Sequence, residues 1–374
     1  MVIGAHSLSL HTESGPTTVR KASAHEVRAW DELVRRFENY RIYHKLAWIR
    51  SLEASLKGRA LYLVFEKVGQ IVGCLPGLVR RLGLLRLFGS PLPGWQTSSM
   101  GPVFDRQRLS TRELIPALVE YLEGRCGIHH IELVGGDLEP KLMQRLGFWG
   151  EPVPTYRARL FPGDHGQGLK ALKDSARRNV RRATKLGLVV RFEEAEGFVD
   201  ICYGQIKEVF IRNGVAVPFD RKRVLEFFRH MKAAGNLMAV SVYLPDGRTC
   251  IATGIFTIEG KELFLWQWAC RNQYRWYRPT ELMTWTVMER AMEAGCDTFD
   301  LMGEGDFKSK FGAELDGSKY RWVRSRYQWL TQARHLAKVL HGWQQSLRGH
   351  FARSRGRGRL ESTAVPGAVA GQEL

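Results

Sequence analysis

The residue types best suited to chemistry lie in one short segment near residue 300, where carboxylates and lysines follow a strand-like run. Residues 298–302 predict a short buried strand, and a Gly-Glu-Gly loop follows it. Loops at strand ends often carry functional side chains into a cleft, because the scaffold fixes where the loop begins. We therefore take Glu304, Asp300 and Lys308 as catalytic candidates, with a carboxylate as the general base for an attacking amine.

Each of these residues also has a structural interpretation. Asp300 alternates with core-facing neighbours, so it can equally be a buried carboxylate that accepts backbone N–H bonds. Lys308 lies four residues after Glu304 and can pair with it, or it can hold a carboxylate or phosphate. Glu304 lies between two glycines and can approach a ligand closely, which makes it the strongest candidate of the three.

A second group lies between a strand predicted over 263–270 and a helix predicted over 279–294. Helix N-termini present free backbone N–H groups and a positive dipole, which suit phosphate or pyrophosphate. The loop and first helical turn are basic and aromatic, and they supply six candidates for cofactor binding: Arg271, Arg275, Trp276, Tyr277, Arg278 and Thr280. The alternative is a solvated basic loop.

A third group is a cationic helix predicted over 169–186. Seven lysines and arginines lie between Lys170 and Lys185, several of them three or four residues apart and therefore on one face. Cations on one helical face repel each other, so the pattern favours an anionic partner, and arginine is the residue best suited to bind phosphate. This helix and a tryptophan of the strand predicted over 263–270 supply the substrate-binding candidates: Arg177, Arg178, Arg181 and Trp268. A solvated charged face is the alternative.

These groups require a scaffold of two α/β units with the same order of elements. Residues 23–162 and 168–330 each read as helices, antiparallel strands, a helix, a strand and a short helix. The segments 127–141 and 295–308 align, which places Glu132 opposite Asp300, and Lys141 near Lys308. A period this long indicates duplicated domains. The match makes a structural role for Asp300 more plausible and weakens the case for Lys308.

The edges of the two units carry further expectations. Residues 1–22 are expected to form a flexible leader, and 331–374 a basic amphipathic helix followed by a disordered tail. Residues 153–160 are expected to close the first unit, and 320–329 to be the last strand of the second. A strand is also predicted over 96–103.

The net charge of +18 and a pI near 9.9 favour anionic partners, namely nucleic acid, a phosphorylated molecule or an anionic membrane. The six cysteines form no C-x-x-C pair, and no metal-ligand spacing is present, so we expect reduced core cysteines and no metal. Without a signal-like or membrane-spanning run, the expected location is the cytoplasm, with peripheral contact at the inner membrane through 331–359.

The order of these segments resembles a known superfamily. The cationic helix from Ser175 to Gly187, the hairpins, the helix 279–294 and the segments 295–301 and 306–312 together resemble the Fem-type tandem GNAT superfamily over residues 25–330. The branch they resemble most is the acetyltransferase-like proteins of bacterial cellulose and exopolysaccharide synthesis, the CelD/BcsL type. The implied fold has two tandem GNAT-like domains, each a mixed, mostly antiparallel sheet flanked by helices.

The resemblance implies acyl transfer to an amine, with acetyl-CoA or another acyl-CoA bound by the second unit. In GNAT folds the donor pyrophosphate lies on a Q/R-x-x-G-x-G/A turn before a helix. The matching place here, 275–280, lacks both glycines, so the close backbone approach that glycine permits is lost. The implied acceptor is an anionic small molecule or a glycan-linked or lipid-linked amine of the cell envelope.

Two other functions fit the same residues. An aminoacyl transferase that takes its donor from tRNA would account directly for the charge of +18. A non-catalytic protein of polysaccharide synthesis could use the segment 331–359 to rest on a membrane surface.

Overall fold

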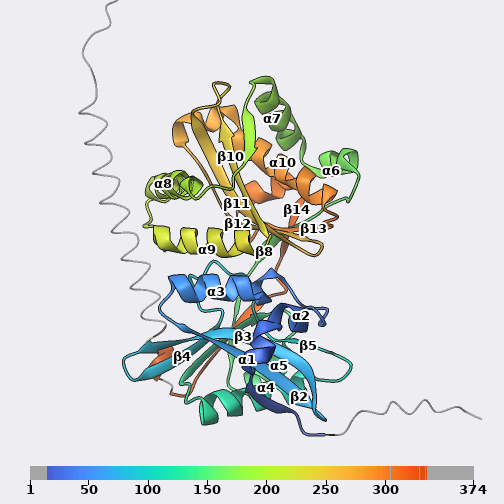
Figure 1. Cartoon of the computed structure of the whole chain (residues 1–374), viewed down its shortest axis with the longest axis vertical. Helices are drawn as coiled ribbons and strands as arrows, with labels where there is room; N and C mark the ends of the chain where they lie inside the picture. The colour runs from blue at the N-terminus through green and yellow to red at the C-terminus, as the bar shows by residue number, and fades with distance from the viewer. Residues whose placement is uncertain (1–14, 304, 328, 333, 335–374) are drawn as a thin grey trace, which may run out of the picture.

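The computed structural model describes residues 15–303, 305–327, 329–332 and 334, whose strands form two mixed sheets (Figure 1). The first sheet has the order β1-β2-β3-β4-β6-β15-β7, with β5 paired to β3: β1 (Thr18–Lys21), β2 (Arg59–Lys67), β3 (Gln70–Leu82), β4 (Leu85–Ser90), β5 (Val103–Phe104), β6 (His130–Gly135), β7 (Trp149–Pro152) and β15 (Tyr320–Ser325). The second has the order β14-β8-β13-β12-β11-β10-β9: β8 (Thr155–Arg159), β9 (Val189–Phe192), β10 (Leu237–Tyr243), β11 (Cys250–Glu259), β12 (Glu262–Cys270), β13 (Thr298–Asp300) and β14 (Ala313–Asp316).

Helices cover both faces of each sheet. The first unit has α1 (Ala24–Arg28), α2 (Trp30–Val34), η1 (Ile42–His44), α3 (Leu46–Ser55), α4 (Thr111–Glu120), the π-helical turn η2 (Tyr121–Arg125) and α5 (Pro140–Arg145). The second has α6 (His165–Ala171), α7 (Asp174–Lys185), α8 (Gly197–Arg212), α9 (Arg221–Ala233), η3 (Asn272–Tyr277), α10 (Pro279–Glu293) and η4 (Asp306–Phe311). Of these, α3 and α9 lie between the two sheets, and α7 and α10 cover the far side of the second (Figure 1).

The predicted duplication is confirmed strand by strand. Read from one edge, β1-β2-β3-β4-β6-β15-β7 of the first sheet corresponds to β9-β10-β11-β12-β13-β8-β14 of the second. In both sheets the fifth strand pairs in parallel with the fourth and antiparallel with the sixth. Glu132 and Asp300 are each the third residue of that fifth strand, so the sequence alignment placed them correctly.

The two units exchange one strand each, which corrects two expectations. Residues 153–160 do not close the first unit: β8 lies between β13 and β14 of the second sheet. The last strand likewise returns to the first sheet, where β15 lies between β6 and β7. Periodicity could not show this, because a strand's own pattern says that one face is buried and not which sheet buries it.

One hydrophobic core joins the units across α3 and α9. The Trp48 ring on α3 meets Phe227 on α9 edge to face at 4.9 Å between ring centroids, and Phe227 stacks on Trp266 of β12 at 4.2 Å. At the border, Glu259 of the β11–β12 turn accepts hydrogen bonds from Lys45 Nζ at 2.8 Å and from the Tyr40 hydroxyl at 2.7 Å. The second sheet is therefore held against the first unit by packing and by buried charge.

Three further segments differ from expectation. The leader 1–22 is ordered at its end, because residues 18–21 pair along the open edge of β2 as β1. The strand expected over 96–103 is largely irregular, with only β5 at its end. The cationic helix breaks at Leu172, whose extended backbone (ψ 147°) separates α6 from α7.

No helix among the described residues is long and apolar enough to cross a membrane. The basic tail expected over 331–374 lies, apart from 331, 332 and 334, outside the described residues, as does Glu304.

Candidate active site

The main cleft of the second unit lies where β12 and β13 separate. The two strands pair in parallel only over three residues, 262–264 with 298–300, and β12 then continues alone to Cys270. A cleft of about 320 Å³ opens there, which we call the β12–α10 cleft. It is lined by Val209, Arg212, Trp268, Ala269, Cys270, Arg275, Arg278, Pro279, Thr280, Glu281, Gly305, Phe307 and Lys308.

A bulge in β12 directs side chains into this cleft. The register against β11 passes from Phe256 opposite Leu265 to Ile255 opposite Gln267, so Trp266 is the extra residue. An extra residue reverses which face the following side chains point to. Leu265 before the bulge and Trp268 after it consequently pack on the same side of the sheet, where Trp268 meets Phe307 edge to face at 5.7 Å between centroids.

The N-terminus of α10 opens into the same cleft. No side chain caps this fifteen-residue helix, and Pro279 occupies its first turn, where its missing N–H is not needed. Arg278 precedes it in the left-handed conformation, at φ 63° and ψ 40°. The first-turn N–H groups, with Arg275 and Arg278 beside them, form an anion-binding arrangement although the turn has no glycine.

Lys308 enters the cleft from the opposite side. Its Nζ donates to the carbonyl oxygens of Met302 and Gly303, the latter at 3.2 Å, in a turn where Met302 also has a positive φ of 51°. Burial lowers the pKa of this amine to about 8, although the charge of Asp300 works against the decrease. Near neutral pH it therefore exchanges a proton more readily than an ordinary lysine.

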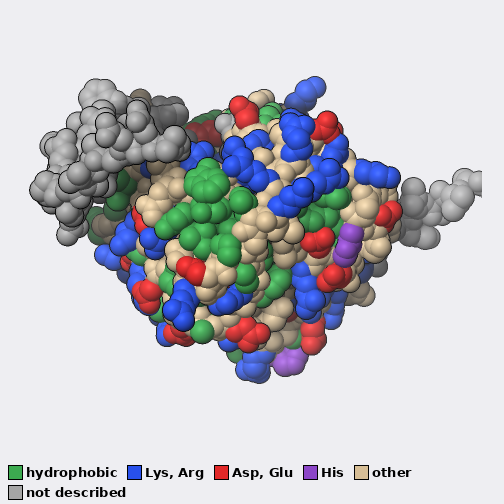
Figure 2. Space-filling model, turned by 90° about the horizontal axis from the view of Figure 1, so that it is seen from above, with side chains coloured by type: hydrophobic (Ala, Val, Ile, Leu, Met, Phe, Trp, Pro, Cys, Tyr) green, Lys and Arg blue, Asp and Glu red, His purple; other side chains and the backbone are tan. Residues whose placement is uncertain are grey.

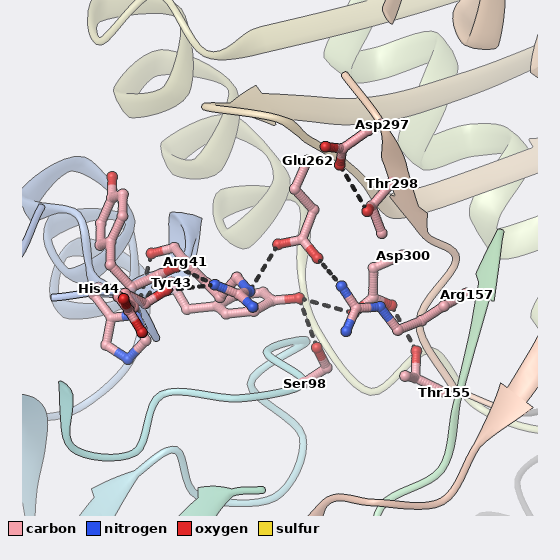
Figure 3. A network of polar contacts seen from close by, with 12 residues as sticks. Arg41, Tyr43, His44, Ser98, Thr155, Arg157, Glu262, Asp297, Thr298 and Asp300 are labelled. Atoms are coloured by element: carbon pink, nitrogen blue, oxygen red, sulfur yellow. Dashed lines mark hydrogen bonds and ion pairs between the residues drawn. The ribbon is translucent and has the colours of Figure 1, made fainter. Parts of the chain in front are cut away.

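Asp300, at the end of β13, is fully buried and belongs to a network of polar contacts (Figure 3). Its Oδ1 accepts from Thr155 Oγ1 at 2.5 Å and from the backbone N–H of Met302 at 2.8 Å. Its Oδ2 lies 3.4 Å from Lys319 Nζ and 3.4 Å from the Tyr43 hydroxyl. Both oxygens are thus occupied by groups from the exchanged strand, the following turn and the first unit.

A second, polar cleft of about 290 Å³ lies between the units, beside Asp300, and we call it the interunit cleft. Its wall includes Glu262, which lies between Arg157 (2.8 Å) and Arg41 (3.5 Å) (Figure 3). Burial and the nearby Asp300 charge raise the pKa of Glu262. Burial, followed by the charge of Asp300, also raises the pKa of Tyr43 well above its usual value.

The cationic helix α7 lies against α10, next to the β12–α10 cleft. Asn179 donates to Glu281 at 2.9 Å, and Arg182 lies over the Trp276 ring at 5.7 Å. Arg178 and Arg181 line a shallow surface with other cations of α7, and Lys and Arg side chains gather on this top face of the second unit (Figure 2). Arg177 turns away from that surface and donates to the carbonyl of Leu172 at 2.7 Å.

The structure brings together part of the predicted set. Five candidates line the β12–α10 cleft: Trp268, Arg275, Arg278, Thr280 and Lys308. Arg271 instead faces Glu208 at 3.8 Å, Trp276 is about half exposed, and Tyr277 packs beside it with ring centroids 3.7 Å apart. These three are not among the residues that line the cleft, and their assignment to the cofactor remains a prediction.

Sequence reasoning missed the buried carboxylate Glu281. It is 3% exposed, lines the β12–α10 cleft, and lies 3.8 Å from Lys310 Nζ. It also missed Tyr43 and Glu262, which the packing of the two units brings next to Asp300. An available signal for Glu281 was its place in the first turn of α10, where an acidic side chain favours the helix dipole.

The corresponding place in the first unit is filled by its own chain. After β4 the segment 98–104 lies along β6, where the N–H groups of Met100 and Gly101 both donate to the carbonyl of Val134. At Gly101 an added Cβ would lie 2.8 Å from that oxygen, so the backbone is in close contact there. The irregular course of residues 96–103 is therefore explained, and the open cleft at this position belongs to the second unit.

These features define a fold of two tandem GNAT-like units. Residues 170–311 match the family model described as an acetyltransferase (GNAT) domain. No protein of curated function matches the sequence significantly. Among the described residues, no group of three or more His, Cys, Asp or Glu side chains is placed to hold a metal.

Several solved structures share the whole architecture. The chain is similar to FemX, with a TM-score of 0.64 at 13% identity over 81% of this chain and 96% of that one. It is similar to a tandem GNAT protein from the clavulanic acid biosynthesis pathway, with a TM-score of 0.53 at 12% identity over 84% of this chain and 99% of that one. It is also similar to L-PGS from Bacillus licheniformis, with a TM-score of 0.50 at 10% identity over 84% of this chain and 95% of that one. At these identities the likeness concerns the fold, and the fold class predicted from the sequence is confirmed.

Proposed function

We propose that the protein is an acyltransferase that binds an acyl-CoA donor in the β12–α10 cleft and transfers the acyl group to an amine. The observation that supports this most is the uncapped N-terminus of α10, which opens into the cleft between Arg275 and Arg278. Two phosphates of a pyrophosphate need several donors at once, and this arrangement supplies backbone N–H groups and two guanidinium groups together. Thr280 adds a hydroxyl in the first turn.

The remaining cleft residues have separate proposed roles in the reaction. Trp268 and Phe307 form an apolar wall that excludes water from the reacting thioester. Backbone N–H groups near the β12 bulge stabilise the oxyanion that forms when the amine attacks. Lys308 in its neutral form, whose Nζ lies at the carbonyl oxygens of Met302 and Gly303, accepts the proton of the attacking amine.

The carboxylates have different proposed roles. Asp300 is a positioning residue, because its bond to the backbone N–H of Met302 fixes the turn that Lys308 binds. Glu304, the general base predicted from the sequence, is the alternative to Lys308 as proton acceptor, and it lies outside the described residues. Glu281 holds Asn179 of α7 against the helix that binds the donor.

The proposed acceptor is an anionic amine from the cell envelope or from exopolysaccharide synthesis, as the CelD/BcsL resemblance implies. Arg178 and Arg181 are its proposed anchors, since they lie on α7 and line one exposed surface. Arg177, which the cationic pattern of the sequence also made a substrate-binding candidate, is instead bonded to the carbonyl oxygens of Lys170 and Leu172.

A test of the donor assignment uses calorimetric titration with acetyl-CoA. We expect Arg275→Ala and Arg278→Ala each to weaken binding about tenfold or more, in line with loss of a charged hydrogen bond to phosphate. Arg290→Ala is the matched control, because this arginine lies in the last turn of the same helix and is exposed. Equal affinities for all three variants, or no binding by the wild type, would refute the acyl-CoA proposal.

One observation favours a second donor, aminoacyl-tRNA. The cations of α7 continue outward from the cleft past Trp276, a longer basic surface than the phosphates of CoA require. Binding to tRNA would then weaken steeply as salt increases, and Arg182→Ala would reduce the slope by about one. Mass spectrometry of the natively purified protein separates the donors: co-purifying acyl-CoA supports the first, and co-purifying tRNA supports the second.

A further inference from the structure

The β3–β4 hairpin of the first unit exposes two leucines at its tip. Leu84 is 97% exposed and Leu82 is 66% exposed, and no large apolar side chain in the described part of the chain is more exposed than Leu84. The tip projects from the sheet after Arg81, and β4 returns with Arg86. Leucines held this far from any core have no packing role within the described chain.

Beside the hairpin lies a groove of about 630 Å³, which is larger than the β12–α10 cleft and the interunit cleft. Six cations and a single carboxylate are among its lining residues: Lys21, Glu53, Lys57, Gly58, Arg59, Ala60, Leu61, Val79, Arg81, Arg86, Arg125, Cys126 and Ile128. Within the described chain none of the six cations forms an ion pair, and the carboxylate of Glu53 accepts the backbone N–H of Ala60 at 2.8 Å. The groove is therefore strongly positive without internal compensation.

Two exposed aromatic rings lie at the same end of the sheet. Tyr327 and Trp329 stack at 6.3 Å between centroids, and Tyr327 stacks on His129 at 6.1 Å. His129 is bonded in turn to the backbone of Arg86, donating from its N–H to that residue's carbonyl at 2.9 Å. The leucine tip, the cationic groove and the aromatic pair thus share one end of the first sheet, where β3 and β15 end and β4 and β6 begin.

We propose that this end of the first unit, the docking face, binds the surface of an anionic lipid bilayer. Leu82 and Leu84 enter the boundary between head groups and acyl chains, Tyr327 and Trp329 lie at head-group depth, and the groove cations bind lipid phosphates. Each part of the face matches one layer of a bilayer surface: apolar, amphipathic and anionic. A nucleic acid would match the cations and would leave the leucine tip in water.

The proposal does not depend on the acyl-transfer chemistry, because the docking face and the β12–α10 cleft are on different units. It also differs from the contact expected through 331–359, since every residue it uses lies before 330. Arg334, the last described residue, also lies on the first unit, where it bonds to Glu132 at 2.7 Å.

The test is co-sedimentation of the full chain with vesicles of phosphatidylcholine containing about 30% phosphatidylglycerol, against pure phosphatidylcholine. We expect binding to the anionic vesicles, and Leu82→Asp/Leu84→Asp should reduce it about tenfold or more, because apolar insertion is lost and charge is repelled. The control is Leu315→Asp on β14, where another leucine is 56% exposed on the other unit. Arg59→Glu/Arg81→Glu should also weaken binding about 25-fold or more, at roughly fivefold for each cation removed.

A second measurement guards against misfolded variants. Quenching of Trp329 by lipids brominated on the acyl chain, taken as the difference between the wild type and Trp329→Phe, reports directly on insertion. We expect quenching with anionic vesicles only. The proposal is overturned if anionic vesicles do not bind, if the leucine and arginine variants bind as the wild type does, or if RNA displaces the vesicles while Trp329 is unquenched.

Discussion

Replacement of Asp300 by asparagine tests whether this carboxylate is structural. It is 1% exposed, and its two oxygens are reached by Thr155 on the exchanged strand, by Lys319 before β15 and by Tyr43 of the first unit. Asparagine retains one oxygen for Thr155 and the following backbone N–H. The other oxygen becomes an NH₂ group that cannot accept from Lys319 or Tyr43.

The distances set the expected size of the effect. At 3.4 Å and an effective permittivity near 20, the attraction between Asp300 and Lys319 is about 5 kcal/mol before desolvation. The neutral amide costs less to bury than the carboxylate, and this difference offsets part of the lost attraction. Hydrogen bonds to the amide are also weaker than those to a charged acceptor. We therefore expect Asp300→Asn to reduce the free energy of unfolding by about 2–4 kcal/mol.

The assay is urea denaturation at pH 7, combined with turnover per folded molecule. A double-mutant cycle with Lys319→Met should give a coupling energy of at least about 1 kcal/mol. Asp297→Asn is the control, because within the described chain that half-buried carboxylate accepts a side-chain hydrogen bond from neighbouring Thr298 alone, at 2.9 Å, and the change should cost under about 1 kcal/mol. A loss of turnover without a loss of stability would refute the structural role and make Asp300 a catalytic residue.

Four further predictions concern charge and backbone. Burial would raise the pKa of Glu259, but its hydrogen-bond partners lower it to about 2. Above pH 5 the free energy of unfolding of the wild type should therefore exceed that of Glu259→Gln by about 2–3 kcal/mol. This difference should vanish as the pH falls from 4.5 towards 2, as urea titrations will show. Since burial lowers the pKa of Lys308 to about 8, kcat/KM should rise with pH through about 8; a pH profile unchanged in Lys308→Met would contradict its role as proton acceptor. Arg278→Gly should raise stability by about 0.5–1 kcal/mol by relieving the left-handed backbone while weakening donor binding, as thermal melts and calorimetry will show. Gly312→Ala should lower the free energy of unfolding by at least about 2 kcal/mol, because its φ is +72° and the new Cβ would lie 2.7 Å from a backbone oxygen. The control is Gly260→Ala, at φ +56° in open space, which should lower it by about 1 kcal/mol. Equal melting temperatures of the two variants would count against the steric argument.

Local pattern was sufficient wherever a residue's role depends on its near neighbours in the chain. The helix predicted over 279–294 is observed as α10, and the short helix 306–311 is observed as η4. The charge of Arg275, Arg278 and Lys308 at element ends also indicated one site, and the structure places all three around one cleft. In each case a strand or helix end fixed the side chain, and strand and helix ends can be read from sequence.

Long-range pairing was not available from pattern. The run 153–160 has the alternation of a half-buried strand, and either sheet would have satisfied it. The burial of Glu281 and Glu262 could not be read from the sequence either, because it arises from α7 and from the first unit, respectively. The filled cleft of the first unit was hidden for the same reason, since the contacts of Gly101 with Val134 join distant parts of the chain.

The sequence by itself determined that the chain is duplicated and basic, and that carboxylates and lysines follow the strand ending at Asp300. Such features depend on composition, on repeat spacing and on helical or strand period, all of which are local quantities. Only the tertiary structure decided that the two units exchange a strand, and that one cleft is open and its counterpart filled. The physical reason is that burial and hydrogen bonding saturate specific atoms, and which atoms are saturated depends on partners far away in sequence.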